Sequence, residues 1–286
     1  IKNPKLMLGV FALSGKGIIV TKTILLTGAT DGIGLETAKM LMQTDCCLLI
    51  HGRNPKKLAD AQAQLSDISQ NTIETYQADL SSFNDTVAFA NEVKSKHSKL
   101  DVIINNAGVF KTSNEITADG LDVRFVVNTL TPYLLTQLLL PLCEKNSRIV
   151  NLSSAAQAPV NLQAMQGNVR LAANAAYAQS KLAITMWSMN MAQQLENEKI
   201  SVVAVNPGSL LASKMVKEGY GIEGEDITIG ADNLTRAALS EEFSQASGQY
   251  YDNDGKRFAP PHRDALDSNK VKEVCQVIDD MVKNFL

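Results

Sequence analysis

The sequence predicts an α/β fold, in which a single doubly wound parallel sheet carries helices on both faces. Short apolar strand patterns alternate with helix patterns along the chain, as expected when helices join parallel strands. Strand patterns such as Leu48-Leu49-Ile50 are apolar at every position, which indicates burial on both faces of the sheet. Hydrophobic residues make up 45% of the 286 residues, so the chain can bury a full core.

The strands are expected at short apolar runs between turns. They cover residues 22–27 (KTILLT), 46–51 (CCLLIH), 72–76 (TIETY), 102–104 (VII), 148–152 (RIVNL) and 201–205 (SVVAV). The run at 72–76 alternates apolar and polar residues, and this pattern also fits a strand.

Helices are expected between these strands. They cover residues 35–43, 56–69, 83–97, 121–144 and 176–197. Within 56–69, the residues Leu58, Ala61, Leu65 and Ile68 recur at the spacing of one buried helix face. The loosest segments are expected at 155–174, 209–226 and 248–267.

The chain is expected to form one domain over residues 22–286, because no internal repeat and no Pro/Gly/Ser-rich linker divides it. Residues 1–21 are expected to be an accessory segment. Lys2 and Lys5 precede an apolar run that imitates a signal sequence, but this run is shorter than the roughly 20 residues that span a bilayer. We therefore expect no membrane partner and a cytoplasmic location.

Charge and cysteine spacing exclude two kinds of site. The net charge is -3 and no basic block occurs, which argues against nucleic acid as a partner. The cysteines Cys46, Cys47, Cys143 and Cys275 have neither CxxC spacing nor histidines at the spacing of a metal site. No metal site is expected, and the cysteines are expected to be reduced packing residues.

A glycine-rich turn, residues 27–34 (TGATDGIG), lies between the first expected strand and the first expected helix. Glycine permits a tight turn and lets backbone N–H groups approach a pyrophosphate, whose charge is favoured at a helix N-terminus. The turn therefore predicts a Rossmann-type dinucleotide site. Its expected cofactor contacts are Gly28, Thr30, Asp31, Gly32, Ile33 and Gly34.

The residues after the second expected strand favour NADP(H) over NAD(H). An NAD site usually has an acidic residue there, whereas this chain has His51-Gly52-Arg53-Asn54. The planar guanidinium of Arg53 can grip a 2′-phosphate, although a solvated arginine at the start of a helix is the alternative. Asp31 is an objection, because a carboxylate close to a 2′-phosphate would be repulsive.

Tyr177 and Lys181 are four residues apart in an expected helix, so both side chains can face one pocket. A nearby cation favours the phenolate and lowers the pKa of a phenol from its usual value of about 10. Tyr177 can then give or take a proton near neutral pH, as general acid–base chemistry requires.

The motifs of the chain occur in a specific order. They are GxxxGxG, Asn105-Asn106-Ala107-Gly108, Asn128, Ser154, YxxxK and Asn206-Pro207-Gly208. With this set the chain resembles the short-chain dehydrogenase/reductase family over about residues 22–252. The segment Thr117-Ala118-Asp119-Gly120-Leu121 resembles the branch of the retinol dehydrogenases and protochlorophyllide reductases.

The resemblance implies roles for particular residues. Tyr177 would be the general acid or base, Lys181 would lower its pKa and hold the nicotinamide ribose, and Ser154 would hydrogen-bond the substrate oxygen. Further cofactor contacts are implied for Asp79, Leu80, Asn105, Ala107, Gly108, Pro207 and Gly208. For Asn105, a structural role in tying strands together is the alternative.

Asn128 also has an argument of its own. Pro132 follows four residues later and has no N–H, so the carbonyl of Asn128 loses its helical partner if the helix continues. Such a carbonyl can bind water and kink the helix. The resemblance implies that Asn128 holds a water that relays protons to Lys181. A helix that starts at Pro132 is the alternative.

The chain departs from the family pattern in two places. Ser154 and Tyr177 are 23 residues apart, about ten more than is usual in the family, so residues 155–174 are expected to form a substrate loop over the mouth of the site. Ala212-Ser213 stands where the family usually has a threonine near the carboxamide, and Ser213 is a possible substitute. Residues 209–226 are expected to be a second substrate loop that closes as a lid, with a static loop as the alternative.

The sequence thus predicts an NADP(H)-dependent oxidoreductase that transfers a hydride between its cofactor and a carbonyl or alcohol substrate. A non-catalytic NADP(H) sensor or scaffold is the alternative. A nucleotide-sugar epimerase is opposed by the GxxxGxG spacing, since epimerases usually have GxxGxxG. The resemblance also suggests a homodimer through the two long helices, unless the insertion at 155–174 blocks it.

Overall fold

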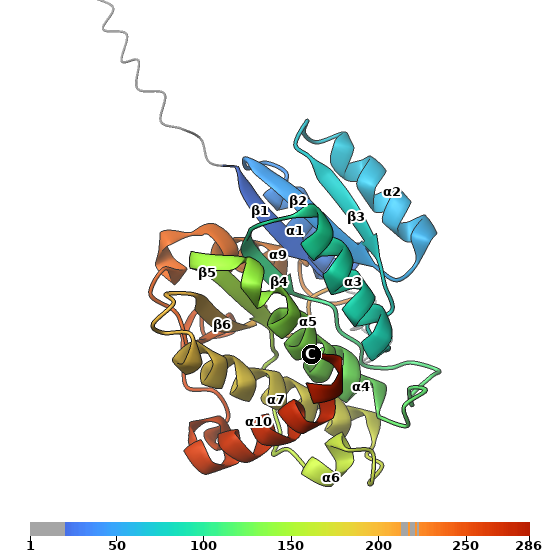
Figure 1. The fold of residues 1–286 in the computed structure, drawn as a ribbon, viewed down its shortest axis with the longest axis vertical. Helices are drawn as coiled ribbons and strands as arrows, with labels where there is room; N and C mark the ends of the chain where they lie inside the picture. Colours follow the sequence, from blue (N-terminus) through green and yellow to red (C-terminus); the bar gives the residue numbers. More distant parts are fainter. Residues whose placement is uncertain (1–20, 213–216, 218–220, 222) are drawn as a thin grey trace, which may run out of the picture.

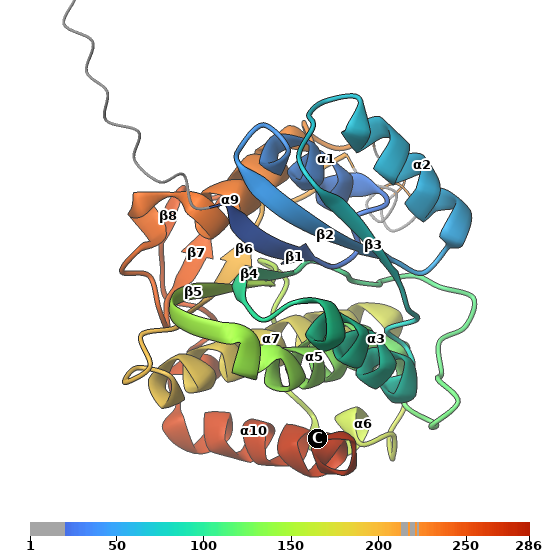
Figure 2. The ribbon, with the colours of Figure 1, turned by 45° about the horizontal axis from the view of Figure 1, so that its top comes forward.

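The fold is given by a computed structural model, which describes residues 21–212, 217, 221 and 223–286. These residues build one eight-stranded sheet with the order β3-β2-β1-β4-β5-β6-β7-β8 (Figures 1 and 2). The strands are β1 (Lys22–Leu26), β2 (Cys46–Gly52), β3 (Ile73–Gln77), β4 (Leu100–Asn105), β5 (Cys143–Leu152), β6 (Ser201–Asn206), β7 (Tyr250–Asp252) and β8 (Arg257–Phe258). All neighbouring pairs are parallel except β7 with β8, so the predicted doubly wound parallel sheet is confirmed.

Helices cover both faces of the sheet (Figure 2). One face packs against α3 (Phe83–Lys96), α5 (Thr131–Leu139) and α7 (Ala173–Gln194). The other face packs against α1 (Gly32–Leu41), α2 (Pro55–Ser66) and α9 (Thr228–Leu239). Alternate residues of one strand serve the two cores: Leu25 faces the first, and Ile24 and Leu26 face the second.

The expected helix over 121–144 is interrupted. The structure has α4 (Val123–Phe125), a π-helical turn (Val126–Leu130), α5, and a 3₁₀ turn (Leu140–Leu142). Because Pro132 has no N–H, the ladder widens just before it, and the Thr131 amide donates to the Val126 carbonyl. Pro141 then ends the helix in the 3₁₀ turn, and β5 begins at Cys143, five residues before the expected start.

The stretch Val123–Leu142 is long enough to cross a membrane and contains an 18-residue window with a mean hydropathy of 1.3, but 78% of that window is buried inside the domain. Its apolar character is therefore explained by packing against the sheet and α7. In α2, the expected apolar face ends at Leu65. The helix stops at Ser66, so Ile68 lies in the following turn and is 40% exposed.

Other elements were not predicted. α9, β7, β8 and α10 (Ser268–Val282) all follow Val205, and β7 and β8 lie in the segment expected to be loose. α6 (Leu162–Met165) lies within the expected substrate loop. α10 packs on α7 (Figure 1). The Tyr133 hydroxyl of α5 donates to Asp279 of α10. α10 therefore covers part of the surface that α5 and α7 would offer to a second copy. Pairing of two copies through these helices stays a prediction.

Two expectations concern segments that the structure describes only in part. Residues 1–20 of the accessory segment lie outside the described residues. In the second substrate loop, residues 213–216, 218–220 and 222 also lie outside them, and Ser213 is among these. The lid over 209–226 and the cytoplasmic location stay predictions.

Candidate active site

A cleft of about 660 Å³ opens at the carboxyl ends of β1 to β6. Open parallel sheets bind ligands at this edge, where the strand order reverses between β1 and β4. The predicted site residues that line it are Gly28, Thr30, Asp31, Gly32, Ile33, Gly34, Arg53, Asp79, Leu80, Ala107, Gly108, Ser154, Tyr177, Lys181, Pro207 and Gly208. Asn105 and Asn128 are not in the lining and are described below.

The glycine turn joins β1 to the N-terminus of α1. Gly28 and Gly32 have φ angles of 66° and 57°, in the left-handed region that favours glycine. Asp31 caps α1, and its carboxylate accepts a hydrogen bond from the Gly32 amide at 2.9 Å. A Cβ atom on Gly34 would lie 2.1 Å from the carbonyl oxygen of Gly28, so no other residue fits this approach of helix to strand.

His51, at the end of β2, is a cleft residue that sequence reasoning missed. Its Nδ1 accepts the Gly28 N–H at 3.2 Å, and its Nε2 lies 3.1 Å from the Ala78 carbonyl. Burial lowers the pKa of His51 to about 4, so the ring is neutral, with its proton on Nε2. The histidine thereby joins the glycine turn to the residues after β3. In the sequence, the signal that could have identified His51 is that a polar residue ends an apolar strand pattern.

Two ion pairs lie near the glycine turn and the residues that follow β2 and β3. Arg53 Nη1 lies 3.8 Å from Asp79 Oδ2, and Lys57 Nζ lies 2.8 Å from Asp31 Oδ2. Lys57 follows Arg53 by four residues and was missed. Its ammonium offsets the negative charge of the Asp31 carboxylate.

The two asparagines at the end of β4 have different partners. Asn105 is buried and donates to Asn151 Oδ1 at 2.8 Å and to Thr136 Oγ1 at 3.0 Å, which ties β4 to β5 and α5. This geometry is the strand-tying alternative of the sequence analysis. Asn106 lines the cleft instead, and its side-chain amide donates to the carbonyls of Thr27 and Gly28.

Tyr177 and Lys181 lie one turn apart on α7 and both line the cleft. Lys181 Nζ lies 5.8 Å from the centre of the Tyr177 ring and donates to the Leu152 carbonyl at 2.7 Å. The lysine is buried, and burial lowers its pKa to about 7. The Tyr177 ring also packs against Phe110, with ring centres 5.0 Å apart.

The two serines after β5 are distinguished by their partners. Ser153 is buried and its hydroxyl lies against α7, 3.1 Å from the Lys181 carbonyl and 2.6 Å from Thr185 Oγ1. Ser154 lines the cleft, and its Oγ accepts the Ala156 amide at 3.1 Å. Its carbonyl accepts hydrogen bonds from the Tyr250 hydroxyl and the Gln157 amide, both at 3.0 Å.

Asn128 lies in the π-helical turn and is fully buried. Its Oδ1 accepts the Val109 N–H at 2.8 Å, while its Nδ2 donates to the Val109 carbonyl and to Ser180 Oγ, both at 3.0 Å. Asn128 therefore fixes the backbone that follows Gly108. Its role in a proton relay stays a prediction.

Apolar residues also line the cleft. They include Val109, Phe110, Ala156, Leu210 and Leu211. Leu210 and Leu211 belong to the expected second substrate loop, whose base is closed by hydrogen bonds between Ala212 and Glu225 and between Glu225 and Leu210. Ala156 belongs to the first. Both loops thus reach the cleft through residues that the structure describes.

The chain is similar in sequence to known proteins. The model of the short chain dehydrogenase family matches residues 22–220. Human retinol dehydrogenase 13 is 31% identical over 270 residues, which cover 84% of this chain and 79% of the relative. Human polyprenol dehydrogenase is 34% identical over 254 residues, which cover 82% and 77% of the two chains.

A solved structure agrees with the fold. A short chain dehydrogenase from Burkholderia cenocepacia J2315, in complex with NADP, superposes with a TM-score of 0.65 at 22% identity and covers 81% of this chain and 95% of that one. The family model and the relatives match most of the chain. The GxxxGxG turn and the YxxxK pair on α7 both line the cleft at the edge of the parallel sheet. The chain therefore belongs to the short-chain dehydrogenase/reductase family of oxidoreductases, in its retinol dehydrogenase-like branch.

Proposed function

We propose that this protein is an NADP(H)-dependent oxidoreductase that transfers a hydride between its cofactor and a carbonyl or alcohol substrate. Tyr177 is the general acid in reduction and the general base in oxidation. The observation that carries the proposal is that one cleft is lined by the glycine turn, by Arg53, and by Ser154, Tyr177 and Lys181.

The residues of the cleft fit a dinucleotide. Gly28 and Gly32, whose backbone is in the left-handed region, and the N-terminus of α1 suit a pyrophosphate. Arg53 lines the cleft and supplies positive charge for a 2′-phosphate, while Lys57 offsets the carboxylate of Asp31. Both favour NADP(H), the cofactor named for the Burkholderia structure. Further contacts would come from Asp79, Leu80, Ala107, Gly108, Pro207 and Gly208. When bound, the cofactor supplies the hydride donor or acceptor.

Three side chains would handle the proton and the substrate oxygen. Lys181, when charged, lowers the pKa of the Tyr177 phenol and so eases proton transfer at its hydroxyl oxygen. Ser154 Oγ donates a hydrogen bond to the substrate oxygen and stabilises the charge that develops there. The hydroxyl of Ser153 bonds to α7, which leaves Ser154 for this role.

We infer that the substrate is apolar near its reacting carbon. Phe110, Leu210 and Leu211 line the cleft, and burial of apolar surface favours the binding of an apolar group there. The names of the relatives, retinol and polyprenol dehydrogenase, agree with an apolar alcohol or aldehyde. All-trans-retinal and a polyprenal are therefore the first probes, beside small polar carbonyls.

A cofactor titration followed by turnover tests the proposal. NADPH fluorescence should change on binding at lower concentration than NADH fluorescence, and loss of NADPH absorbance should follow addition of an apolar aldehyde. The Tyr177→Phe variant is the matched control for turnover. NADPH binding without turnover of any probe would favour the sensor or scaffold, and absence of binding would overturn both readings.

A further inference from the structure

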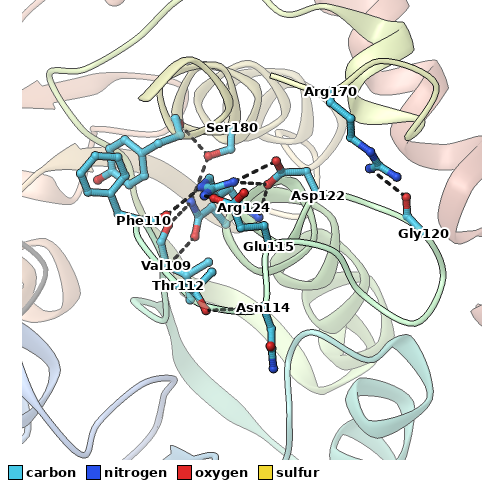
Figure 3. A network of polar contacts seen from close by, with 12 residues as sticks. Val109, Phe110, Thr112, Asn114, Glu115, Gly120, Asp122, Arg124, Arg170 and Ser180 are labelled. Atoms are coloured by element: carbon cyan, nitrogen blue, oxygen red, sulfur yellow. Dashed lines mark hydrogen bonds and ion pairs between the residues drawn. The ribbon is translucent and has the colours of Figure 1, made fainter. Parts of the chain in front are cut away.

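Arg124 is a fully buried arginine beside the candidate active site. It lies on α4 and faces residues 109–122, here called the Phe110 loop, which connect the end of β4 to α4 (Figure 3). The loop brings Phe110 and Lys111 to the lining of the cleft. An arginine stays charged at any accessible pH, so its burial requires partners for the whole guanidinium.

Each nitrogen of this guanidinium bonds to a different residue in the Phe110 loop (Figure 3). Nε donates to the Phe110 carbonyl at 2.7 Å, Nη1 donates to the Asp122 carboxylate at 2.9 Å, and Nη2 donates to the Glu115 carboxylate. One side chain therefore holds the beginning, the middle and the end of the loop. A lysine has a single ammonium and cannot reproduce three bonds in the plane of a guanidinium.

The Phe110 loop, held by Arg124, contacts Tyr177 through the ring of Phe110. Phe110 is 3% exposed, and its ring meets the Tyr177 ring at an interplanar angle of 53° with 5.0 Å between centres. Asn128 holds Val109, the preceding residue, through both its N–H and its carbonyl. The backbone at 109 and 110 is thus fixed from α4 and the π-helical turn, and the Phe110 side chain is fixed against the phenol.

We propose that Arg124 is a positioning residue for the reaction of Tyr177, acting through the backbone and ring of Phe110. The ring of Phe110 limits the positions that the phenol can occupy, and Arg124 limits the positions of Phe110. A displacement of about 1 Å at a reacting group can cost about 10²-fold in rate. The inference rests on the proposed role of Tyr177, and it assigns no substrate contact to Arg124.

The variant Arg124→Lys tests the inference, with Arg148→Lys as the matched control. Arg148 is a half-buried arginine on β5 whose Nη1 donates to the carbonyls of Ala237 and Ser240 on the far side of the sheet. With NADPH and all-trans-retinal, Arg124→Lys should lower kcat by about 10–10²-fold while the Kd for NADPH stays near the wild-type value. Arg148→Lys should change neither quantity.

Two measurements report on the phenol and the loop without turnover. Hydrogen exchange should become faster in the Phe110 loop of Arg124→Lys, and the fluorine NMR signal of Tyr177 in fluorotyrosine-labelled protein should shift or broaden. The Tyr177→Phe spectrum assigns that signal. If wild type turns over no carbonyl, the proposed function fails, yet these two measurements still decide whether Arg124 positions Phe110 and Tyr177.

Phe110→Leu shows whether Arg124 acts through the ring. It should reproduce the loss in kcat, and the double variant should lose no more than either single variant, because both changes break the same chain of contacts. If Arg124→Lys does not fold, Phe110→Leu and Glu115→Gln carry the test, since Glu115 is half-exposed and its loss weakens one bond only. Three results would each overturn the inference. They are a wild-type kcat in folded Arg124→Lys or in Phe110→Leu, additive losses of kcat in the double variant, and an unchanged Tyr177 signal in Arg124→Lys.

Discussion

Lys181 Nζ lies 2.7 Å from the carbonyl oxygen of Leu152, the last residue of β5, and the side chain is buried. The strand thus holds the ammonium beside the Tyr177 ring, on the helix turn that the YxxxK spacing predicts. Burial lowers the pKa of Lys181 to about 7, so its charge changes within the physiological range.

We predict that NADPH binding takes up a proton through Lys181 at pH 7.5–8.5. A pKa of about 7 leaves the lysine mostly neutral there, and a bound anion stabilises its charged form and raises that pKa. Calorimetry in buffers of different ionisation enthalpy measures the uptake. Lys181→Met should abolish it, and equal uptake by both proteins would assign the proton to another group.

Tyr177→Phe should leave NADP(H) binding nearly intact and lower turnover by about 10²–10⁴-fold, the usual contribution of a positioned acid. Tyr133→Phe is the control, because Tyr133 is buried against Trp187 and bonds to Asp279 away from the cleft. Steady-state rates with the best probe aldehyde decide the matter. Near wild-type turnover of Tyr177→Phe contradicts the acid–base assignment.

Arg53→Ala should weaken NADPH more than NADH. A charge-assisted contact with a 2′-phosphate contributes roughly 1.5–3 kcal/mol, which NADH cannot make. Lys56→Ala is the matched control, since Lys56 is a neighbouring cation on α2 that pairs with Asp60. Equal weakening of both cofactors by Arg53→Ala, or a preference of wild type for NADH, would remove the argument for NADP(H).

The parts of the site that sequence predicts are those whose chemistry is local. The glycine turn and the YxxxK pair each lie within a few residues, and both line the cleft. Pro132 likewise predicts a local break, because the missing N–H acts on its own helix turn. The structure shows this break as a π-helical turn rather than a simple kink.

Other features depend on contacts between distant residues, which no local pattern reveals. Asn105 and Asn106 are adjacent and chemically identical, yet only the tertiary packing sends one toward β5 and the other toward the glycine turn. The role of His51 depends on its hydrogen bond with the N–H of Gly28, which is 23 residues away in the sequence. β7 has three residues and β8 has two, too few for a periodic pattern to appear.

His51 should make the protein less stable as the pH falls from about 6.5 to about 4. Its pKa is 6.5 in an ordinary setting and about 4 in the fold, so in this window the unfolded chain binds a proton that the native state does not. The loss is at most about 3 kcal/mol, from 1.36 kcal/mol per pKa unit. Denaturant unfolding at pH 7 and pH 4.5 measures it.

His51→Gln is the matched variant for this measurement. A glutamine can accept the Gly28 N–H and donate to the Ala78 carbonyl, but it does not titrate. The free energy of unfolding of the variant should therefore fall less than that of wild type between the two pH values. Parallel curves for the two proteins would place the acid sensitivity elsewhere.

Tyr250→Phe tests how Ser154 is held. The Tyr250 hydroxyl and the Gln157 amide both donate to the Ser154 carbonyl at 3.0 Å, and the His262 N–H donates to Gln157 Oε1 at 3.0 Å. Tyr250 is 6% exposed, and burial raises the pKa of its phenol, so it remains a donor across the neutral range.

Loss of the Tyr250 hydroxyl leaves Ser154 with less support while the cofactor contacts are untouched. A hydrogen bond of this kind contributes about 0.5–1.5 kcal/mol, so kcat should fall by about 2–10-fold with the Kd for NADP(H) unchanged. Tyr76→Phe is the control, because it removes a buried hydroxyl that bonds to Glu74, away from Ser154. Adding Gln157→Leu to Tyr250→Phe should lower kcat beyond the sum of the two single effects, since the Ser154 carbonyl then loses both donors. An unchanged kcat in that double variant would show that the Ser154 carbonyl needs neither donor for turnover.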